Sequence, residues 1–493
     1  MADPITETAD IQGILKSGYG PLTESTQLLL RVRDPAKARA WLAKAKPTSI
    51  ADLEVKVPAA LHVAISAPGL RALGLAEAVV RGFSPEFVSG MAADAARSRR
   101  LGDVGPNAPE HWDWGTAAWE PHLLVMLFAE PGGLGPFRAG VVTPAFKQAF
   151  EVRELAAATL DGNEPFGFVD GISQPQVDWA AARTPSTADD LDYGNQIAAG
   201  EFVLGYANEY GRITNRPLLN PGQDAGGMLP RAPDAPDRAD LGRNGSYLVL
   251  RQLDQDVRGF WRFAAANGGQ PLAEAMVGRR LDGQPLVAAS STTIRGVGPK
   301  ADDVRLNSFD FDSDQLGLAC PFTGHIRRAN PRTGDLPGGD QGLLKFLLGM
   351  LGLGVDRRAD TIASSRFHRL LRRGRKYGQT LSPAEAADPA APDPKAGLLF
   401  VSLSANIQRQ FEFVQGAWLA SAKFGGLTGE QDPLLGVRLP FPGDQRTDGF
   451  RQPQAAGPCR EIEAMPQFIR MRGGGYFFLP GLRALKFIAA GGA

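Results

Sequence analysis

An internal similarity at a constant offset of 220 residues constrains the fold of this chain more than any other feature. Residues 28–41 read LLLRVRDPAKARAW, and residues 248–261 read LVLRQLDQDVRGFW. Each copy joins an apolar run of strand length to an aspartate at a helix start and then to a stretch of helical periodicity. Either this match arose by chance or the chain is duplicated, and duplication predicts two similar halves. The identical pairs are Leu28 and Leu248, Leu30 and Leu250, Arg31 and Arg251, Asp34 and Asp254, and Trp41 and Trp261.

Other apolar runs extend this pattern in both halves. LHVAIS (61–66) precedes a helix that opens at PGLRALG, and HLLVMLFAE (122–130) is nearly all apolar. In the second half, GLLFVSLS (397–404) precedes a helix at NIQRQFEFVQGAWLA. Strands that alternate with helices predict an α+β fold of two units whose helices cover sheet faces. Residues 215–245 are rich in Pro, Gly and Asp, so they are the expected linker between domains 1–214 and 246–493.

The charge balance argues against a nucleic-acid or membrane partner. The 53 Lys and Arg residues equal the 53 Asp and Glu residues, so no net field attracts polyanions. The longest apolar candidate, LLKFLLGMLGLGV (343–355), falls short of the roughly 18 residues of a spanning helix and contains Lys345. Two cysteines are too few for a disulfide framework. With an acidic N-terminus and no signal-like segment, a cytoplasmic location is expected.

Four of the five histidines favour structural or surface roles. His62 and His122 fall within apolar strands, where a hydrogen-bonded structural imidazole is common. His111 lies among tryptophans in EHWDW, as a loop packing site does. His368 lies in the basic stretch SRFHRLLRRGRKYG and is expected to face solvent.

The fifth histidine, His325, opens HIRRANPR and stands beside Arg327, Arg328 and Arg332. A neutral imidazole can bind a metal, and guanidinium groups bind carboxylates through two parallel hydrogen bonds. A metal ligand beside such a clamp suits haem, whose iron takes an axial histidine and whose propionates need cations. An exposed basic loop with an incidental histidine is the alternative.

A lone carboxylate in GFVDGISQP (167–175) raises a second question. Asp170 follows an apolar run and precedes Gly171, which fits either an ordinary turn or the wall of a small-molecule cavity. The sequence lacks the HExxH, CxxC, GxSxG and Walker motifs, so it carries no motif for zinc hydrolysis, thiol redox chemistry, serine hydrolysis or P-loop nucleotide chemistry.

Taken together, these motifs resemble the dye-decolourising peroxidase family, in its larger C/D-like subgroup. The family is marked by a GxxDG motif, a later axial histidine and a downstream arginine. The resemblance covers essentially the whole chain, and its combination of motifs is specific. It implies two ferredoxin-like domains, with antiparallel sheets covered by helices and haem held mainly by the C-terminal domain. The resembling stretches are GFVDGISQP, HIRRANPR, LLRRGRKYG, IQGILKSGYG, GEFVLGYANEYG, NGSYLVLRQLDQDV and ANIQRQFEFVQGAW.

The resemblance implies roles for individual residues. Asp170 matches the distal acid–base, His325 the axial ligand and Arg372 the distal arginine. Glu412 is the expected acceptor of the N–H of His325. His325 and Arg372 are 372 − 325 = 47 residues apart, and residues 334–356 look like an insertion between them. If that insertion displaces Arg372, then Arg366 or Arg369 is the expected replacement.

Further residues are expected around the same cofactor. Gly167 and Gly171 would let backbone approach the macrocycle, and Arg327 would meet a propionate. Leu398 and Phe400, alternate residues of one strand, would line the distal pocket. The family resemblance implies one haem b per chain, hydrogen peroxide and an aromatic reductant as substrates, and a monomer or small homo-oligomer. A haem-storing or haem-sensing protein is the alternative, and it would not need Asp170 and Arg372.

Overall fold

The computed structural model describes most of the chain. The predicted insertion at 334–356 lies outside the described residues, and so does the apolar run at 343–355. The described residues are 5–185, 194–290, 294, 296–297, 301–332, 365–390, 392–393, 395–424, 427–439 and 447–492.

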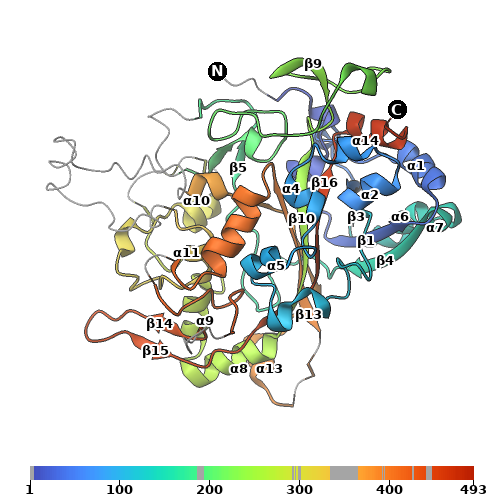
Figure 1. The fold of residues 1–493 in the computed structure, drawn as a ribbon. Helices are drawn as coiled ribbons and strands as arrows, with labels where there is room; N and C mark the ends of the chain where they lie inside the picture. The colour runs from blue at the N-terminus through green and yellow to red at the C-terminus, as the bar shows by residue number, and fades with distance from the viewer. Residues whose placement is uncertain are drawn as a thin grey trace, which may run out of the picture.

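Within these ranges, a 9-stranded antiparallel sheet runs through the centre of the molecule (Figure 1). Its strand order is β11-β13-β10-β16-β2-β3-β1-β4, and β12 pairs with β13. The N-terminal half supplies β1 (Glu24–Val32), β2 (Ala59–Ile65), β3 (Leu123–Ala129) and β4 (Phe150–Ala156). The C-terminal half supplies β10 (Ser246–Gln255), β11 (Leu371–Arg372), β12 (Arg375–Gly378), β13 (Ala396–Ser404) and β16 (Ile469–Leu479).

The two halves meet where β16 pairs with β2, at Phe478 and Ile65. The predicted α+β fold with two ferredoxin-like halves is confirmed, and the halves continue one another's sheet. The predicted linker at 215–245 contains a small 3-stranded sheet of its own. That sheet consists of β7 (Leu218–Leu219), β8 (Arg231–Ala232) and β9 (Ala235–Asp240).

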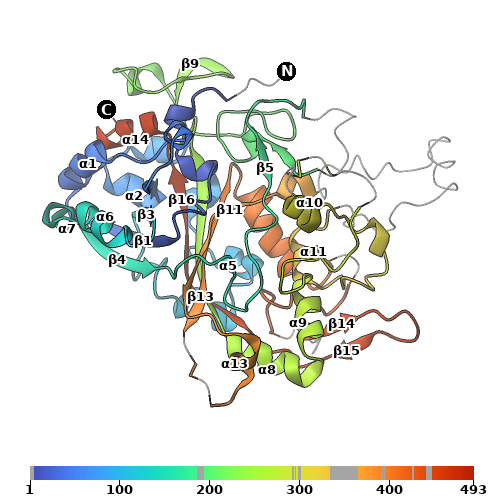
Figure 2. The same ribbon diagram turned by 180° about the vertical axis from the view of Figure 1, so that it is seen from behind.

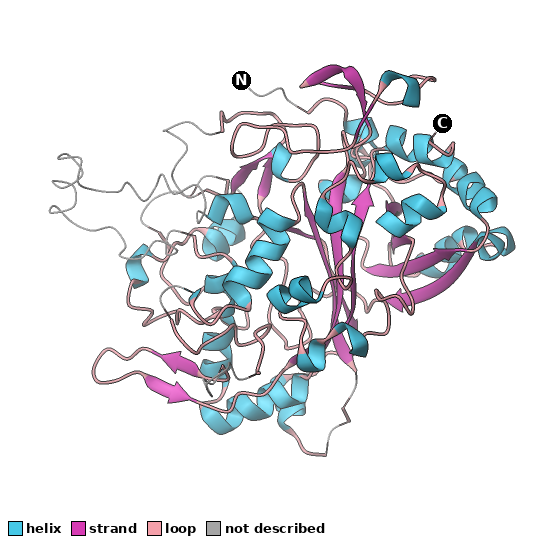
Figure 3. Cartoon of the chain, in the orientation of Figure 1, coloured by secondary structure: helices cyan, strands magenta, loops and turns pink. Residues whose placement is uncertain are grey.

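Helices cover the sheet on both sides (Figure 3). None of the described helices combines the length and apolar character that crossing a membrane requires. The N-terminal half carries α1 (Pro35–Lys44), α2 (Ala67–Ala72), α3 (Glu77–Val80), α4 (Pro85–Ser89), α5 (Ala95–Leu101), α6 (Leu134–Val141) and α7 (Pro144–Ala149). The C-terminal half carries α8 (Val257–Asn267), α9 (Gln270–Val277), α10 (Ala301–Asn307), α11 (His325–Ala329), α13 (Pro383–Ala387) and α14 (Leu482–Ala489). Short strands outside the central sheet are β5 (Gln176–Asp178), β6 (Gln196–Ala198), β14 (Phe450–Gln452) and β15 (Arg460–Ile462).

The repeated segments form the same strand–helix unit with one difference. In the first copy, the Asp34 carboxylate accepts a hydrogen bond from the N–H of Lys37 and caps α1. In the second copy, the cap of α8 is Asp256, which accepts from the N–H of Gly259 at 2.7 Å. The prediction that Asp254 begins this helix is therefore wrong. Strand β10 continues past Asp254, whose carboxylate accepts a hydrogen bond from the hydroxyl of Tyr377.

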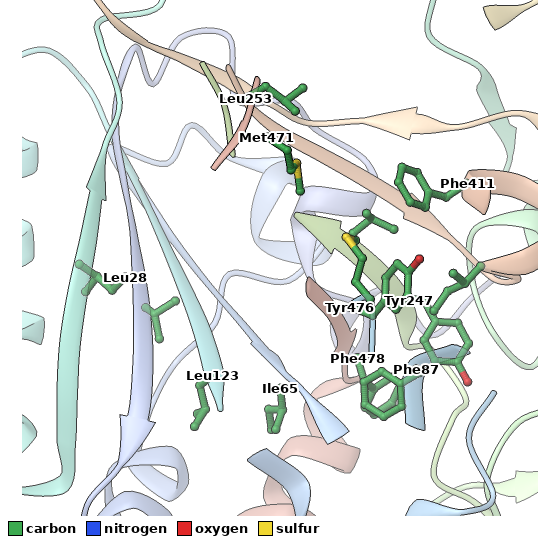
Figure 4. Packing of buried hydrophobic residues seen from close by; sticks show 14 of the residues in the cluster. Leu28, Ile65, Phe87, Leu123, Tyr247, Leu253, Phe411, Met471, Tyr476 and Phe478 are labelled. Carbon is green, nitrogen blue, oxygen red and sulfur yellow. The ribbon is translucent and has the colours of Figure 1, made fainter. Parts of the chain in front are cut away.

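The apolar strands read as continuous runs because both faces of the sheet are buried. Leu28 packs in one cluster, whereas its neighbour Leu29 packs in the cluster on the other face. The first cluster extends from Leu123 in the N-terminal half to Tyr247 and Phe478 in the C-terminal half (Figure 4). A shared core therefore ties the two halves together.

This core predicts a large difference between two truncations. Leu250 of β10 is 0% exposed, so Leu250→Ala should lower the free energy of unfolding by about 2–5 kcal/mol, because it leaves a cavity. Val55 is 71% exposed, so Val55→Ala should change it by less than about 0.5 kcal/mol. Urea unfolding followed by circular dichroism measures both, and equal midpoints would contradict the assigned packing.

Candidate functional site

A cavity of about 870 Å³ lies against the β10, β13 and β16 strands of the C-terminal half. Its volume is within the range of about 300–1,000 Å³ that ligand sites in proteins occupy. The walls come from the turn around Asp170, the first residues of α11, strand β11 and the helical segment that follows β13. In both Figure 1 and Figure 2, α11 and the orange helical segment after β13 lie on the same side of the central sheet. The fold thus brings Asp170, His325 and Arg372 to one cavity.

The turn that carries Asp170 depends on glycine for its conformation. Gly167 has φ +100° and Gly171 has φ +78°, which residues with a Cβ rarely adopt. Gly171 borders the cavity, whereas Gly167 lies outside its lining. The expectation that Gly167 lets backbone approach a macrocycle therefore stays a prediction, and the positive φ of Gly167 is itself a reason for a glycine there. The Asp170 side chain stays 47% exposed, so it can exchange protons with a molecule in the cavity.

Arg372 of β11 faces this aspartate. Its Nη1 lies 3.9 Å from Oδ1 of Asp170. Its backbone N–H donates to Oε1 of Gln174 at 3.0 Å, and Nη2 donates to the carbonyl of Ser173 at 3.3 Å. The segment that follows Asp170 thereby holds the arginine in place.

The replacements considered for Arg372 have other contacts. Arg369 borders the cavity but donates to Oδ1 of Asn195 at 2.6 Å. The guanidinium of Arg366 lies over the ring of Phe367. Of these three arginines, Arg372 is the one that the structure pairs with Asp170.

His325 begins α11 and borders the cavity. Its Nδ1 lies 2.9 Å from Oδ2 of Asp432, a completely buried carboxylate. Oδ1 of Asp432 also accepts from the N–H groups of Leu434 and Leu435. Burial alone would raise the pKa of Asp432, but the charge and hydrogen bond of His325 and the N–H of Leu435 outweigh it and hold the pKa below its usual range. A carboxylate at Nδ1 selects the tautomer whose Nε2 is unprotonated, which is the form that binds a metal.

The prediction that Glu412 accepts the N–H of His325 is wrong. Oε1 of Glu412 accepts from the hydroxyl of Tyr476 at 2.8 Å and lies 3.0 Å from Nε of Arg97. Burial raises the pKa of Glu412. Asp432 takes the expected place, although its sequence context, GEQDPLL, carries no motif. Only the fold places this loop against α11.

The expectation that Arg327 meets a cofactor carboxylate is also corrected. Its Nη1 donates to Oδ2 of Asp314 at 3.1 Å and to the carbonyl of Cys320 at 2.7 Å. Residues four apart share one face of a helix, so His325 and Ala329 border the cavity while Arg327 points elsewhere. Arg332 is the nearby arginine of HIRRANPR that borders the cavity.

His368 is buried, so the expectation that it faces solvent is wrong. Its ring stacks on Phe413 with centroids 3.8 Å apart and borders the cavity. Phe413 separates two short π-helices, η12 (Gln408–Glu412) and η13 (Val414–Leu419). Such wide turns are frequent at functional sites. The predicted helix after β13 exists, but with this wider winding.

The apolar wall of the cavity contains the two residues that were expected to line it. Leu398 and Phe400 are alternate residues of β13, and both border the cavity. Leu398 pairs with Leu253 and Phe400 with Arg251 on β10. A flat apolar face of this kind suits the surface of a macrocycle.

Sequence reasoning missed Glu164, six residues before Asp170. It borders the cavity, and its carboxylate accepts hydrogen bonds from Phe166, Phe168 and Gln255. Burial raises its pKa to about 7, although these hydrogen bonds lower it. Nothing in NEPFGFVDG separates this glutamate from an ordinary turn residue.

The residues around the cavity fit haem. They combine an imidazole held by a buried carboxylate, an apolar strand face and cationic side chains at the border. This is the donor chemistry that a haem iron, its ring and its propionates require.

Comparisons with known proteins agree on one group. No family model matches the chain. It is 29% identical to the multifunctional dye peroxidase DyP2 of an Amycolatopsis species, across 94% of this chain and 91% of that one. It is 27% identical to the dye-decolorizing peroxidase AauDyP1 of Auricularia auricula-judae, across 97% of this chain and 86% of that one. A crystal structure of a fungal DyP-type peroxidase from Auricularia auricula-judae superposes with a TM-score of 0.70, at 25% identity and 99% coverage of both chains.

The buried contact of Asp432 predicts a pH-dependent loss of stability. Asp432→Asn should lower the free energy of unfolding by about 2 kcal/mol at neutral pH, because a charge-assisted hydrogen bond is lost. The pKa of Asp432 in the folded protein lies below its usual range. The difference in unfolding free energy between wild type and variant should therefore have its full size above about pH 4 and become smaller as the pH falls further. Urea unfolding at several pH values measures it. Asp302→Asn is the control, since the side chain of Asp302 is 82% exposed; equal losses in both variants would contradict the assignment.

Proposed function

This chain belongs to the dye-decolorizing peroxidase family, and from that premise we propose that it is a haem peroxidase that reduces hydrogen peroxide and oxidises dyes, phenols or other bulky aromatic donors. One observation carries the proposal: a carboxylate-bound imidazole and a separate acid–guanidinium pair border the same cavity. A protein that only stores or senses haem would need the imidazole without the pair, so the pair favours turnover.

The proposed cofactor is one haem b per chain, held mainly by the C-terminal half. His325 would bind its iron, and Leu398 and Phe400 would contact its ring. Arg332, rather than Arg327, borders the cavity where it could meet a carboxylate. The bound iron would supply the redox chemistry that side chains lack. The Asp432 carboxylate, by accepting the N–H of His325, makes the imidazole a more electron-rich ligand.

Asp170 is the proposed acid–base. Peroxide must lose a proton from one oxygen and gain one on the departing oxygen, and one carboxylate within reach of both can do each in turn. The position of Arg372, 3.9 Å from this carboxylate, places a fixed positive charge where negative charge develops. The backbone and side-chain contacts of Arg372 with Gln174 and Ser173 keep that charge in place without reorganisation.

Several finer expectations stay predictions. They are the haem type and stoichiometry, the monomer or small homo-oligomer, the cytoplasmic location and the lack of a nucleic-acid partner. We propose 2,6-dimethoxyphenol as the first reductant to assay, because the structure of a dye-decolorizing peroxidase of the same fold has been solved in complex with it.

Haem content should distinguish the proposed role of His325 as iron ligand from that of Asp170 as acid–base. His325→Ala should purify without bound haem because its only proposed iron ligand is lost, whereas Asp170→Asn should retain haem. The ratio of Soret to protein absorbance measures this, with His111→Ala as the control because His111 is exposed. Equal haem content in His325→Ala and the wild type would show that the ligand is misassigned.

Turnover should depend on the acid. Asp170→Asn should lower kcat/KM for peroxide by about 10²–10⁴-fold, the usual contribution of a general acid–base. Oxidation of 2,6-dimethoxyphenol at matched haem concentration measures the loss. Asp302→Asn, at an exposed aspartate on α10, should keep wild-type kinetics. An active Asp170→Asn enzyme would overturn the assigned role.

A further inference from the structure

Glu164 places a second carboxyl group behind the Asp170 turn, and the proposed chemistry does not use it. Oε1 of Glu164 accepts from the N–H of Phe168 at 3.0 Å. Its Oε2 accepts from the N–H of Phe166 at 3.0 Å and from Nε2 of Gln255 at 2.9 Å. The half-buried residue borders the same cavity as Asp170.

These three partners are all donors, so the site is built for an ionised carboxylate. A neutral carboxyl would turn a hydroxyl hydrogen or a weakened acceptor toward at least one of these N–H groups. Protein atoms around the carboxyl nevertheless disfavour charge and raise its pKa to about 7, and the charge of Asp170 adds to this. Both forms are therefore populated near neutral pH.

The backbone of Glu164 is bonded to the same turn. Its N–H donates to the carbonyl of Phe168 at 2.9 Å, and its carbonyl accepts from the N–H of Gly167 at 2.9 Å. Phe166 stacks on Phe260 of α8 with centroids 4.4 Å apart, so the start of the turn is anchored to the core. Phe168 lies two residues before Asp170 and is bonded to both the backbone and the side chain of Glu164. A change in the hydrogen bond from its N–H to the Glu164 carboxylate would therefore change the conformation of the turn.

We propose that Glu164 is a positioning residue for Asp170, and that its ionised carboxylate holds the turn in the form where Asp170 meets Arg372, while its protonation loosens that turn. The proposal rests on the proposed function only for the role of Asp170. The hydrogen bonds themselves do not depend on haem.

The groups around Glu164 come from three elements, and each charged side chain among them has another partner. Within the turn, the charged group is Asp170, which lies against Arg372. Gln255 is the polar contact from β10, while α8 contributes Phe260 and Trp261, whose Nε1 donates to the carbonyl of Phe166. On β12, Lys376 pairs with Asp161 at 2.6 Å, and Arg375 donates to the carbonyls of Gly18 and Tyr19.

Glu164→Gln tests the proposal through a pH profile of kcat/KM for peroxide. Glutamine resembles the protonated acid, so variant and wild type should agree well below pH 7 and diverge above it. Above about pH 8 the wild type should be about tenfold faster, the effect of one lost charge-assisted hydrogen bond. A ratio that is constant with pH would overturn the proposal.

Glu24→Gln is the matched control. Glu24 also accepts from two backbone N–H groups, those of Gly132 and Leu134, but it lies outside the cavity lining. Its variant should give a rate ratio to the wild type that does not vary with pH. A pH-dependent ratio equal to that of Glu164→Gln would show that the effect is not specific to the Asp170 turn.

Infrared titration of the purified full-length protein, with or without haem, gives a second readout. The wild type should show a protonated carboxyl band that disappears with a midpoint near pH 7, and Glu164→Gln should lack it. Gln255→Leu removes one donor to the anion and should move the midpoint up by about one pH unit, even if Glu164→Gln folds poorly. A titration midpoint that Gln255→Leu leaves unchanged would overturn the inference. If the wild-type protein shows the carboxyl band and its shift in Gln255→Leu but does not turn over peroxide, the proposed function alone would be overturned.

Discussion

The pairing of β10 with its two neighbours is the constraint on which the site depends. Its register with β13 sets Leu253 beside Leu398 and Arg251 beside Phe400, and these side chains form the cavity wall. Leu250, which precedes Arg251 on β10, packs into the core on the other face. Because side chains alternate along a strand, a slip of one residue would bury the cavity wall in the core and expose the core to the cavity.

The two carboxylates that contact His325 and Arg372 differ in burial, and this difference matches their proposed tasks. Asp432 is completely buried, which suits a group that orients an imidazole and never exchanges with solvent. Asp170 is half exposed to the cavity, as a group that gives and takes protons must be. Glu164 accepts hydrogen bonds from the turn that precedes Asp170, and Arg372 lies against the Asp170 carboxylate.

Asp170, His325 and Arg372 border one cavity, as their motifs implied, because the backbone conformation within each motif is set by nearby residues. GFVDG needs glycines at positive φ on either side of the aspartate, and HIRRANPR begins a helix at the residue that must face the cavity. Assignments that depended on which side chain meets which partner were less successful. Arg327 failed because a helix turns its third residue away from the face of its first, and Glu412 failed because a closer carboxylate came from a distant loop.

Apolar periodicity and the repeated strand–helix unit were enough to predict an α+β fold of two units, because these signals are local. Asp170, His325 and Arg372 were assigned from motifs that resemble those of the dye-decolourising peroxidase family. The joining of both halves into one sheet, the contact of Asp432 with His325 and the place of Glu164 behind Asp170 came from the folded chain alone. Each joins segments that are far apart or share no pattern, and such contacts are selected by the packing of the whole molecule rather than by neighbouring residues.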